Sequence, residues 1–181
     1  MKFPFLLLAF ACLASAEAQD TGKGRKDRER KADDRRKDEK RLQLPKGFFV
    51  LENLEEAQSK AATEEKPVTF LITAEGTGDE WTIDATEKFI DEVKNTVIVY
   101  VKFQDANDRA VKMPEAVKAA LAKLREDRGS IPQIPIVVIT DAAVSKALTS
   151  VASNRFYDGR TQKPKLSKAL EYLRQEIQKI E

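Results

Sequence analysis

The sequence predicts an α/β fold, a central mixed sheet of about four to five strands with helices on both faces. Three runs are rich in β-branched and aromatic residues and carry little charge, which is typical of strands buried on both sides. They are Val68 to Thr73, Thr96 to Phe103 and Ile136 to Thr140. Between and after them, apolar residues recur at the spacing of amphipathic helices. Because helices and strands alternate, the sheet is expected to be partly parallel.

The first half of the predicted domain begins where the composition changes, at Leu42 to Pro45. Residues 48–50 predict a short first strand. Residues 52–64 predict a helix, because apolar and small side chains recur there at helical spacing. Lys66-Pro67 ends that helix, and the strand at residues 68–73 follows.

The second half alternates in the same way. Asp84 to Glu87 resembles a capping box, so a helix is expected to begin there. Pro114 suits the first position of another helix, which Gly129 ends. One further strand is expected around Asn154 to Tyr157, and residues 166–180 carry the apolar stripe of a final helix.

Of two residue types that carry much of enzyme chemistry, one is missing and the other occurs once. The 181 residues include no histidine, and the single cysteine is Cys12. The chain therefore lacks the usual general base at neutral pH, the commonest metal ligand and, after residue 12, any thiolate. Ser-His-Asp, Cys-His and zinc-thiolate chemistry are excluded. We expect no enzyme, no cofactor and no metal site; an enzyme that uses carboxylates is the remaining alternative of that class.

The first 16 residues predict a secretory signal peptide. Met1-Lys2 is a short positive start, Phe3 to Leu13 is an apolar run too short to span a bilayer, and Ala14 to Ala16 has the small-residue pattern of a cleavage site. Cleavage after Ala16 or Ala18 satisfies this pattern. A buried N-terminal strand and a lipid-attached Cys12 are the alternatives. The sequence thus predicts an exported protein, periplasmic or extracellular.

Residues 17–44 predict a charged, disordered linker. Its segment 23–41 holds eleven basic and six acidic side chains, a net charge of +5, with Ala32 as the only apolar side chain. Such a segment cannot bury enough surface to offset the entropy lost on ordering. One interpretation is a solvated tether. The other is adhesion to an anionic surface, which the interleaved acids weaken.

Two local features give the part after the linker a resemblance to a known family. One is Lys66-Pro-Val-Thr-Phe-Leu-Ile-Thr-Ala-Glu75, and the other is Ser130-Ile-Pro-Gln-Ile-Pro135-Ile-Val-Val-Ile. Both are similar to segments of the thioredoxin-like superfamily, in which a central strand runs into the active loop and a cis proline precedes another strand. The resemblance covers roughly residues 48–181. The predicted domain spans residues 45–181. It implies that Ile134-Pro135 is a cis peptide bond.

The chain departs from this family at the redox motif. The resemblance implies that Thr77-Gly78-Asp79-Glu80 stands where the family has its two redox cysteines and the residues between them. Thiol–disulfide exchange needs a thiolate, and neither Thr77 nor Glu80 can supply one. The resemblance therefore implies a member without disulfide oxidoreductase activity. The carboxylates here are interpreted as residues favoured at a helix N-terminus.

The resemblance leaves one kind of site that needs no sulfur. The backbone beside a cis proline can pair with an extended peptide by strand addition. The predicted groove is lined by Gly76, Thr77, Trp81, Ile134 and Pro135. Trp81, the only tryptophan, is either a contact anchor or a core residue. The favoured function is a redox-inactive module that binds an exported protein or peptide, and the alternative is a structural envelope component held by residues 23–41.

Overall fold

The structure is a computed structural model. It describes residues 46–74, 79–108, 111–127, 133–158, 160, 161 and 163–180, all of which belong to the compact unit Lys40–Glu181. The predicted signal peptide (1–16) and the predicted linker (17–44) lie outside the described residues. So do Gly76, Thr77 and Gly78 of the predicted site.

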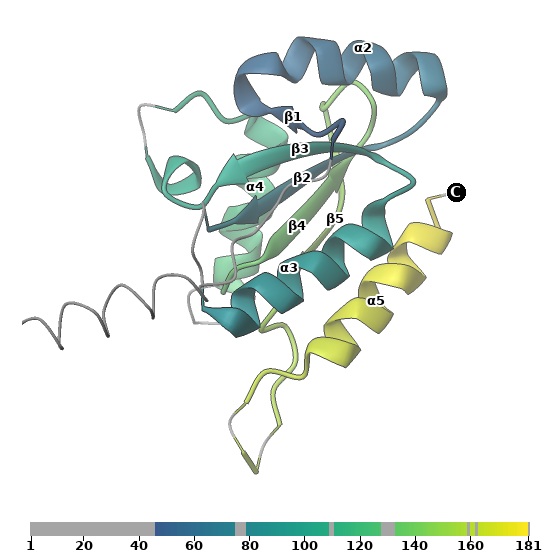
Figure 1. The fold of residues 1–181 in the computed structure, drawn as a ribbon. Helices are drawn as coiled ribbons and strands as arrows, with labels where there is room; N and C mark the ends of the chain where they lie inside the picture. The colour runs from purple at the N-terminus through teal and green to yellow at the C-terminus, as the bar shows by residue number, and fades with distance from the viewer. Residues whose placement is uncertain are drawn as a thin grey trace, which may run out of the picture. The chain divides into compact units, whose positions relative to one another are not determined.

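The described residues form a five-stranded mixed sheet in the order β1-β3-β2-β4-β5 (Figure 1). β3 is parallel to both β1 and β2, whereas β4 is antiparallel to β2, and β5 is antiparallel to β4. The strands are β1 (Phe49–Val50), β2 (Val68–Thr73), β3 (Val97–Lys102), β4 (Ile136–Thr140) and β5 (Ala147–Ala152). The central strands β2 and β4 are buried along their whole length, as their continuous apolar sequences predict.

Helices cover both faces of this sheet (Figure 1). They are α2 (Leu54–Glu64), α3 (Glu80–Val93), α4 (Glu115–Glu126) and α5 (Leu166–Gln178), with 3₁₀ turns η1 (Leu51–Asn53) and η2 (Asp105–Asn107). Side chains of α2 and α4 pack against one face, and those of α3 and α5 against the other. The predicted α/β class, with a mixed sheet between two helical layers, is confirmed.

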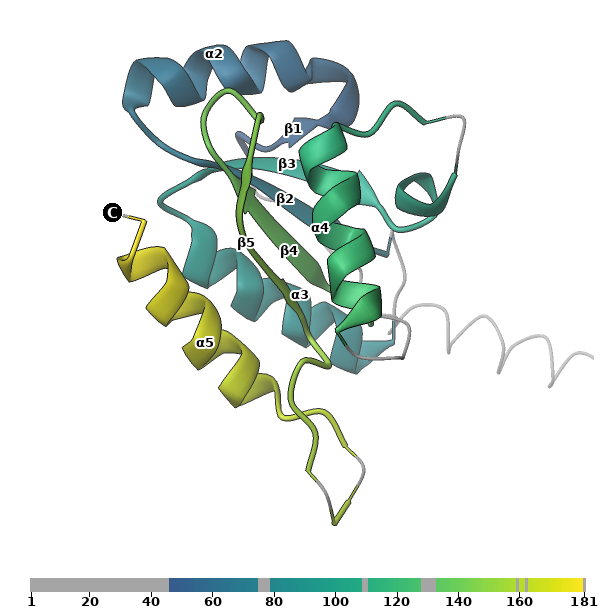
Figure 2. The same cartoon turned by 180° about the vertical axis from the view of Figure 1, so that it is seen from behind.

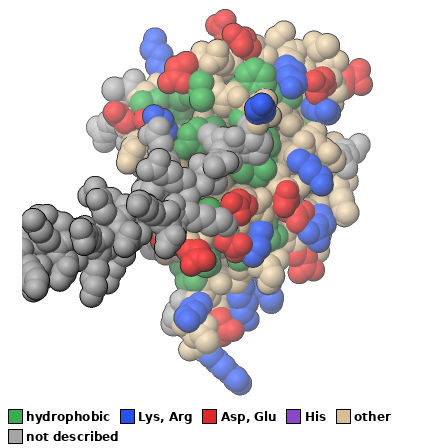
Figure 3. All heavy atoms as spheres, viewed as in Figure 1, with side chains coloured by type: hydrophobic (Ala, Val, Ile, Leu, Met, Phe, Trp, Pro, Cys, Tyr) green, Lys and Arg blue, Asp and Glu red, His purple; other side chains and the backbone are tan. Residues whose placement is uncertain are grey.

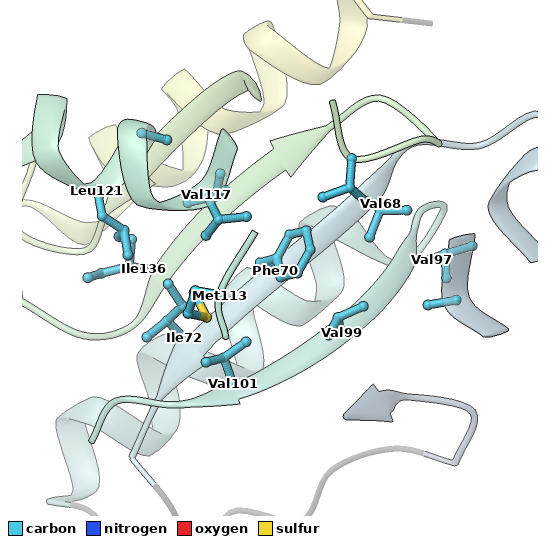
Figure 4. Packing of buried hydrophobic residues seen from close by; sticks show 14 of the residues in the cluster. Val68, Phe70, Ile72, Val97, Val99, Val101, Met113, Val117, Leu121 and Ile136 are labelled. Atoms are coloured by element: carbon cyan, nitrogen blue, oxygen red, sulfur yellow. The ribbon is translucent and has the colours of Figure 1, made fainter. Parts of the chain in front are cut away.

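The core on the α2–α4 face shows why β2 has this sequence. Val68, Phe70 and Ile72 point to this face, where they meet alternate residues of β3 (Figure 4). Their spacing follows from the two-residue period of a strand. The helices contribute small and branched side chains: Ala57, Ala61, Val117, Ala120, Leu121 and Leu124. Burying a side chain such as Phe70 stabilises the fold by roughly 1.5–3 kcal/mol.

The opposite core lies under α3 and α5. Leu71 of β2 points to this face, where it joins Phe89 of α3 and Leu173 of α5, and all three are fully buried. At the surface above, Arg174 of α5 donates hydrogen bonds to both carboxylate oxygens of Glu92 on α3. A bidentate pair of this kind aligns the two helices.

Two predicted boundaries are wrong. α3 begins at Glu80 and not at Asp84, because Asp79 accepts a hydrogen bond from the Thr82 N–H at 3.0 Å and so caps the helix. Asp84 lies one turn inside, where its carboxylate pairs with Lys88 at 2.7 Å.

The second error concerns the last strand. It is β5 at Ala147–Ala152, and the residues predicted as a strand, Asn154 to Tyr157, form a turn and one isolated bridge to Pro164. The segment Ala-Leu-Thr-Ser-Val-Ala has few strong strand formers. It is a strand because β4 pairs with it.

Candidate functional site

The predicted cis proline lies at the carboxyl end of β2. The Ile134-Pro135 peptide bond is cis, as predicted. Pro135 directly precedes β4, whose first residue, Ile136, pairs with Ile72 near the end of β2. The chain leaves β2 at this end and returns at the start of α3, so the cis bond and the first turn of α3 lie at the same end of the sheet.

The segment around Pro135 is held from the end of β5. The Ser153 N–H donates to the Pro135 carbonyl at 2.9 Å. The Ser153 hydroxyl lies 3.0 Å from the Gln133 carbonyl oxygen and 2.9 Å from that of Ile134, a donor shared by two acceptors. The Gln133 N–H donates to Asn154 Oδ1 at 3.1 Å. Ser153 and Asn154 are buried, whereas Gln133 is exposed, so these bonds are partly shielded from water.

Sequence reasoning missed Ser153 and Asn154. Ser153 directly precedes the segment predicted as a strand and Asn154 is its first residue. Nothing local marks either as a partner of a loop about twenty residues earlier. Polar residues that directly follow a strand beside a proline loop are the one signal that was present. Ser and Asn at a strand end commonly bond to nearby backbone.

The backbone of Ile134 is only half available to a ligand. Its carbonyl accepts from the Ser153 hydroxyl, whereas no described residue accepts a hydrogen bond from its N–H. A carbonyl has two lone pairs and can accept a second bond. Ile134 therefore offers an extended peptide one donor and part of one acceptor.

Trp81 lies in the first turn of α3. Its side chain is 36% exposed, which places it among the few large apolar side chains of the described residues that face solvent. Its neighbour Thr82 is buried, and both its N–H and its hydroxyl donate to the Asp79 carboxylate, at 3.0 and 2.6 Å. The cap thus sets the start of the helix and with it the position of Trp81.

A chain of hydroxyl groups joins the end of β2 to this helix. The Thr86 hydroxyl donates to the Thr82 carbonyl at 2.7 Å, so its only proton is used. The 2.9 Å contact between the hydroxyls of Thr73 and Thr86 must then have Thr73 as the donor. All three threonines are buried. The Tyr100 hydroxyl also donates to the Ala74 carbonyl at 3.1 Å, directly beyond β2.

The described carboxyl groups with a resolved shift all have a lowered pKa. That of Asp79 is held below its ordinary value of 3.8, first by the Thr82 hydroxyl and then by the Thr82 N–H. The pKa values of Glu64, Asp141 and Asp158 are lowered as well, chiefly by hydrogen bonds. Each of these groups is anionic at neutral pH and serves as a hydrogen-bond acceptor, not as a proton donor.

The surface charges are mixed in sign. On the face seen in Figure 3, acidic and basic side chains of the described residues are interspersed. Among these residues no group of three or more acids could hold a metal ion, and none of the described helices is long and apolar enough to cross a membrane.

Comparisons with known proteins give a limited picture. No family model matches the chain, and no curated protein matches it. Among solved structures, it is similar to oxidised thioredoxin O2 from Arabidopsis thaliana, with 15% identity, a TM-score of 0.32, and coverage of 60% of this chain and 84% of that one. The strand order and directions and the two helical layers are consistent with the thioredoxin-like fold that the sequence predicts.

Proposed function

We propose that this chain is an exported thioredoxin-like module without thiol chemistry that binds extended segments of other proteins at the carboxyl end of β2. The observation that carries the proposal is the Ile134 N–H, which has no acceptor among the described residues, at the same end of the sheet as the exposed Trp81. Both are positioned by part-buried hydrogen bonds, those of Ser153 and those between Asp79 and Thr82, so little order would have to be gained on binding.

The binding mode follows from these groups. A peptide carbonyl would accept from the Ile134 N–H, and a peptide N–H would donate to the second lone pair of the Ile134 carbonyl. An apolar side chain of the peptide would pack on the Trp81 ring. Tryptophan is frequent among the residues that dominate binding energy, because it buries a large rigid surface.

The chemistry available supports binding and not catalysis. No cysteine follows Cys12, so a chain cleaved after Ala16 or Ala18 has no sulfur nucleophile. Insulin reduction with dithiothreitol as the reductant tests this directly. Turnover above the rate with dithiothreitol alone would overturn the redox-inactive part of the proposal. Export is tested by the N-terminal residue of the secreted chain, expected to be Glu17 or Gln19.

The binding part is tested with a displayed library of random peptides. Selected peptides would be measured against the wild type, Trp81→Ala and a control, Val50→Ala, whose residue is an exposed apolar one (42%) on β1, away from both ends of the proposed contact. Loss of a contact anchor costs about 2 kcal/mol, or roughly thirtyfold in affinity. We expect that loss for Trp81→Ala alone, with amide chemical-shift changes at Ile134. If the two variants bound the selected peptides with equal affinity, the proposed binding site at Trp81 would be ruled out.

A further inference from the structure

A second surface lies at the opposite side of the sheet from β1, along the outer edge of β5. Among the described residues β5 pairs only with β4, so its other edge is open. Proteins usually protect such edges with charged residues or proline. The six residues of β5, Ala-Leu-Thr-Ser-Val-Ala, include neither.

The open edge presents backbone groups in a regular pattern. In an antiparallel pair, the backbone N–H and C=O groups of successive residues point alternately toward the partner strand and away from it. The backbone groups of Ser153 point toward β4, since the Ser153 N–H donates to the Pro135 carbonyl. The backbone groups of Val151 and Thr149 then also point toward β4, whereas those of Ser150 and Ala152 point to the open edge. The Ala152 carbonyl already accepts from the Arg155 N–H at 2.9 Å. Ala152 is fully buried and does not line the groove, so the outward groups left for a ligand are the N–H and C=O of Ser150.

This edge forms the floor of a groove. In Figure 2, β5 lies between α4 and α5. The groove has a volume of about 470 Å³, and α4 lines it with small side chains, Ala116, Ala119 and Ala120. Leu148 is left without a partner on β4 by the register shift between Ile139 and Thr140, and it is 37% exposed in the groove.

The charged side chains lining the groove include one more cation than carboxylate. Lys123, Lys146 and Arg155 line it, together with Asp127 and Glu176. Glu176 is already paired with Lys179 at 2.5 Å. The Arg155 guanidinium stacks over the Tyr172 ring, 4.0 Å from its centroid, and no described carboxylate pairs with any of the three cations. A ligand in the groove would therefore meet three cations that no described carboxylate pairs with. It would also meet one carboxylate, that of Asp127, besides the paired Glu176.

We propose that this groove binds an extended peptide segment with acidic side chains, which adds to β5 as a sixth strand. Main-chain hydrogen bonds to the N–H and C=O of Ser150 would hold the peptide backbone, and Leu148 would contact an apolar side chain. Lys123, Lys146 and Arg155 would select carboxylates. This surface is distinct from the one at Trp81.

The probe is a fluorescein-labelled peptide with a Val-Thr core between pairs of glutamates. One comparison peptide carries lysines in place of the glutamates. A second keeps the glutamates, but alternate backbone amides of its core are methylated. Fluorescence anisotropy would measure affinity for the full-length protein, for Lys123→Glu/Lys146→Glu and for a matched double reversal, Lys60→Glu/Lys94→Glu. Lys60 and Lys94 line a separate hollow near the start of β3, so the control makes the same change in net charge away from β5.

We expect the glutamate probe to bind, with the strongest amide shifts at Ser150, and the lysine and methylated peptides to bind at least about tenfold more weakly. Lys123→Glu/Lys146→Glu should lose affinity by a similar factor, and the control pair and Trp81→Ala should retain it. Equal binding of the lysine or methylated peptide would overturn the proposal. A dimer in sedimentation that Leu148→Lys dissociates would assign the edge to a second copy and overturn it too.

Discussion

The Thr73 hydroxyl, at the carboxyl end of β2, donates a 2.9 Å hydrogen bond to the Thr86 hydroxyl of α3, and both groups are fully buried. This bond links the central strand to the helix that carries Trp81. Thr86 must be the acceptor in this bond, because its only hydroxyl proton is donated to the Thr82 carbonyl.

Replacing Thr86 by the similarly shaped valine should destabilise the fold. The Thr73 hydroxyl would lose its acceptor in a dry environment, which costs about 1–3 kcal/mol. The double change Thr73→Val/Thr86→Val should cost less than the sum of the single changes, because it leaves no unpaired donor. Urea unfolding of the four proteins measures the coupling. Additive costs would mean that the two hydroxyls act independently.

Asp79 should contribute stability that depends on pH. Because the pKa of Asp79 is lowered from 3.8 by bonds from Thr82, its contribution is present above pH 3.8 and is lost as the pH falls through the folded-state value. Asp79→Asn keeps an N-cap acceptor and should remove this dependence, whereas Asp79→Ala should cost about 1 kcal/mol at neutral pH. Asp91→Ala, an exposed change on the same helix, is the control. Parallel stability–pH curves for the wild type and Asp79→Asn would contradict the role assigned to this carboxylate.

Phe89 and Trp81 should differ in their contribution to stability, although both lie on α3. Phe89 is fully buried between helix and sheet, and its replacement by alanine should cost about 3–5 kcal/mol. Trp81→Ala should cost clearly less, because that side chain already meets solvent. Thermal unfolding followed by circular dichroism compares the two. Equal losses would show that Trp81 is a core residue, as the alternative interpretation of the sequence holds.

The wrong predictions share a cause. A strand was predicted at residues 154–157, before Asp158-Gly159, yet nothing local shows which segment β4 pairs with. Asp84 and Glu87 have the spacing of a capping box, but Asp79 has the bonded cap position. In both cases a local pattern fitted two places, and packing against the sheet selected one.

The sequence alone determined the features that depend on neighbouring residues or on composition. Continuous β-branched runs specify strands buried on both faces, helical spacing specifies the layers above them, and the lack of histidine and of any cysteine after residue 12 removes whole classes of chemistry. Only the tertiary structure decided which distant groups meet. Ser153 and Asn154 hold the segment before Pro135, and β5 leaves one edge open between α4 and α5. Such contacts depend on strand pairing and on the directions of single hydrogen bonds, which no periodicity in the chain encodes.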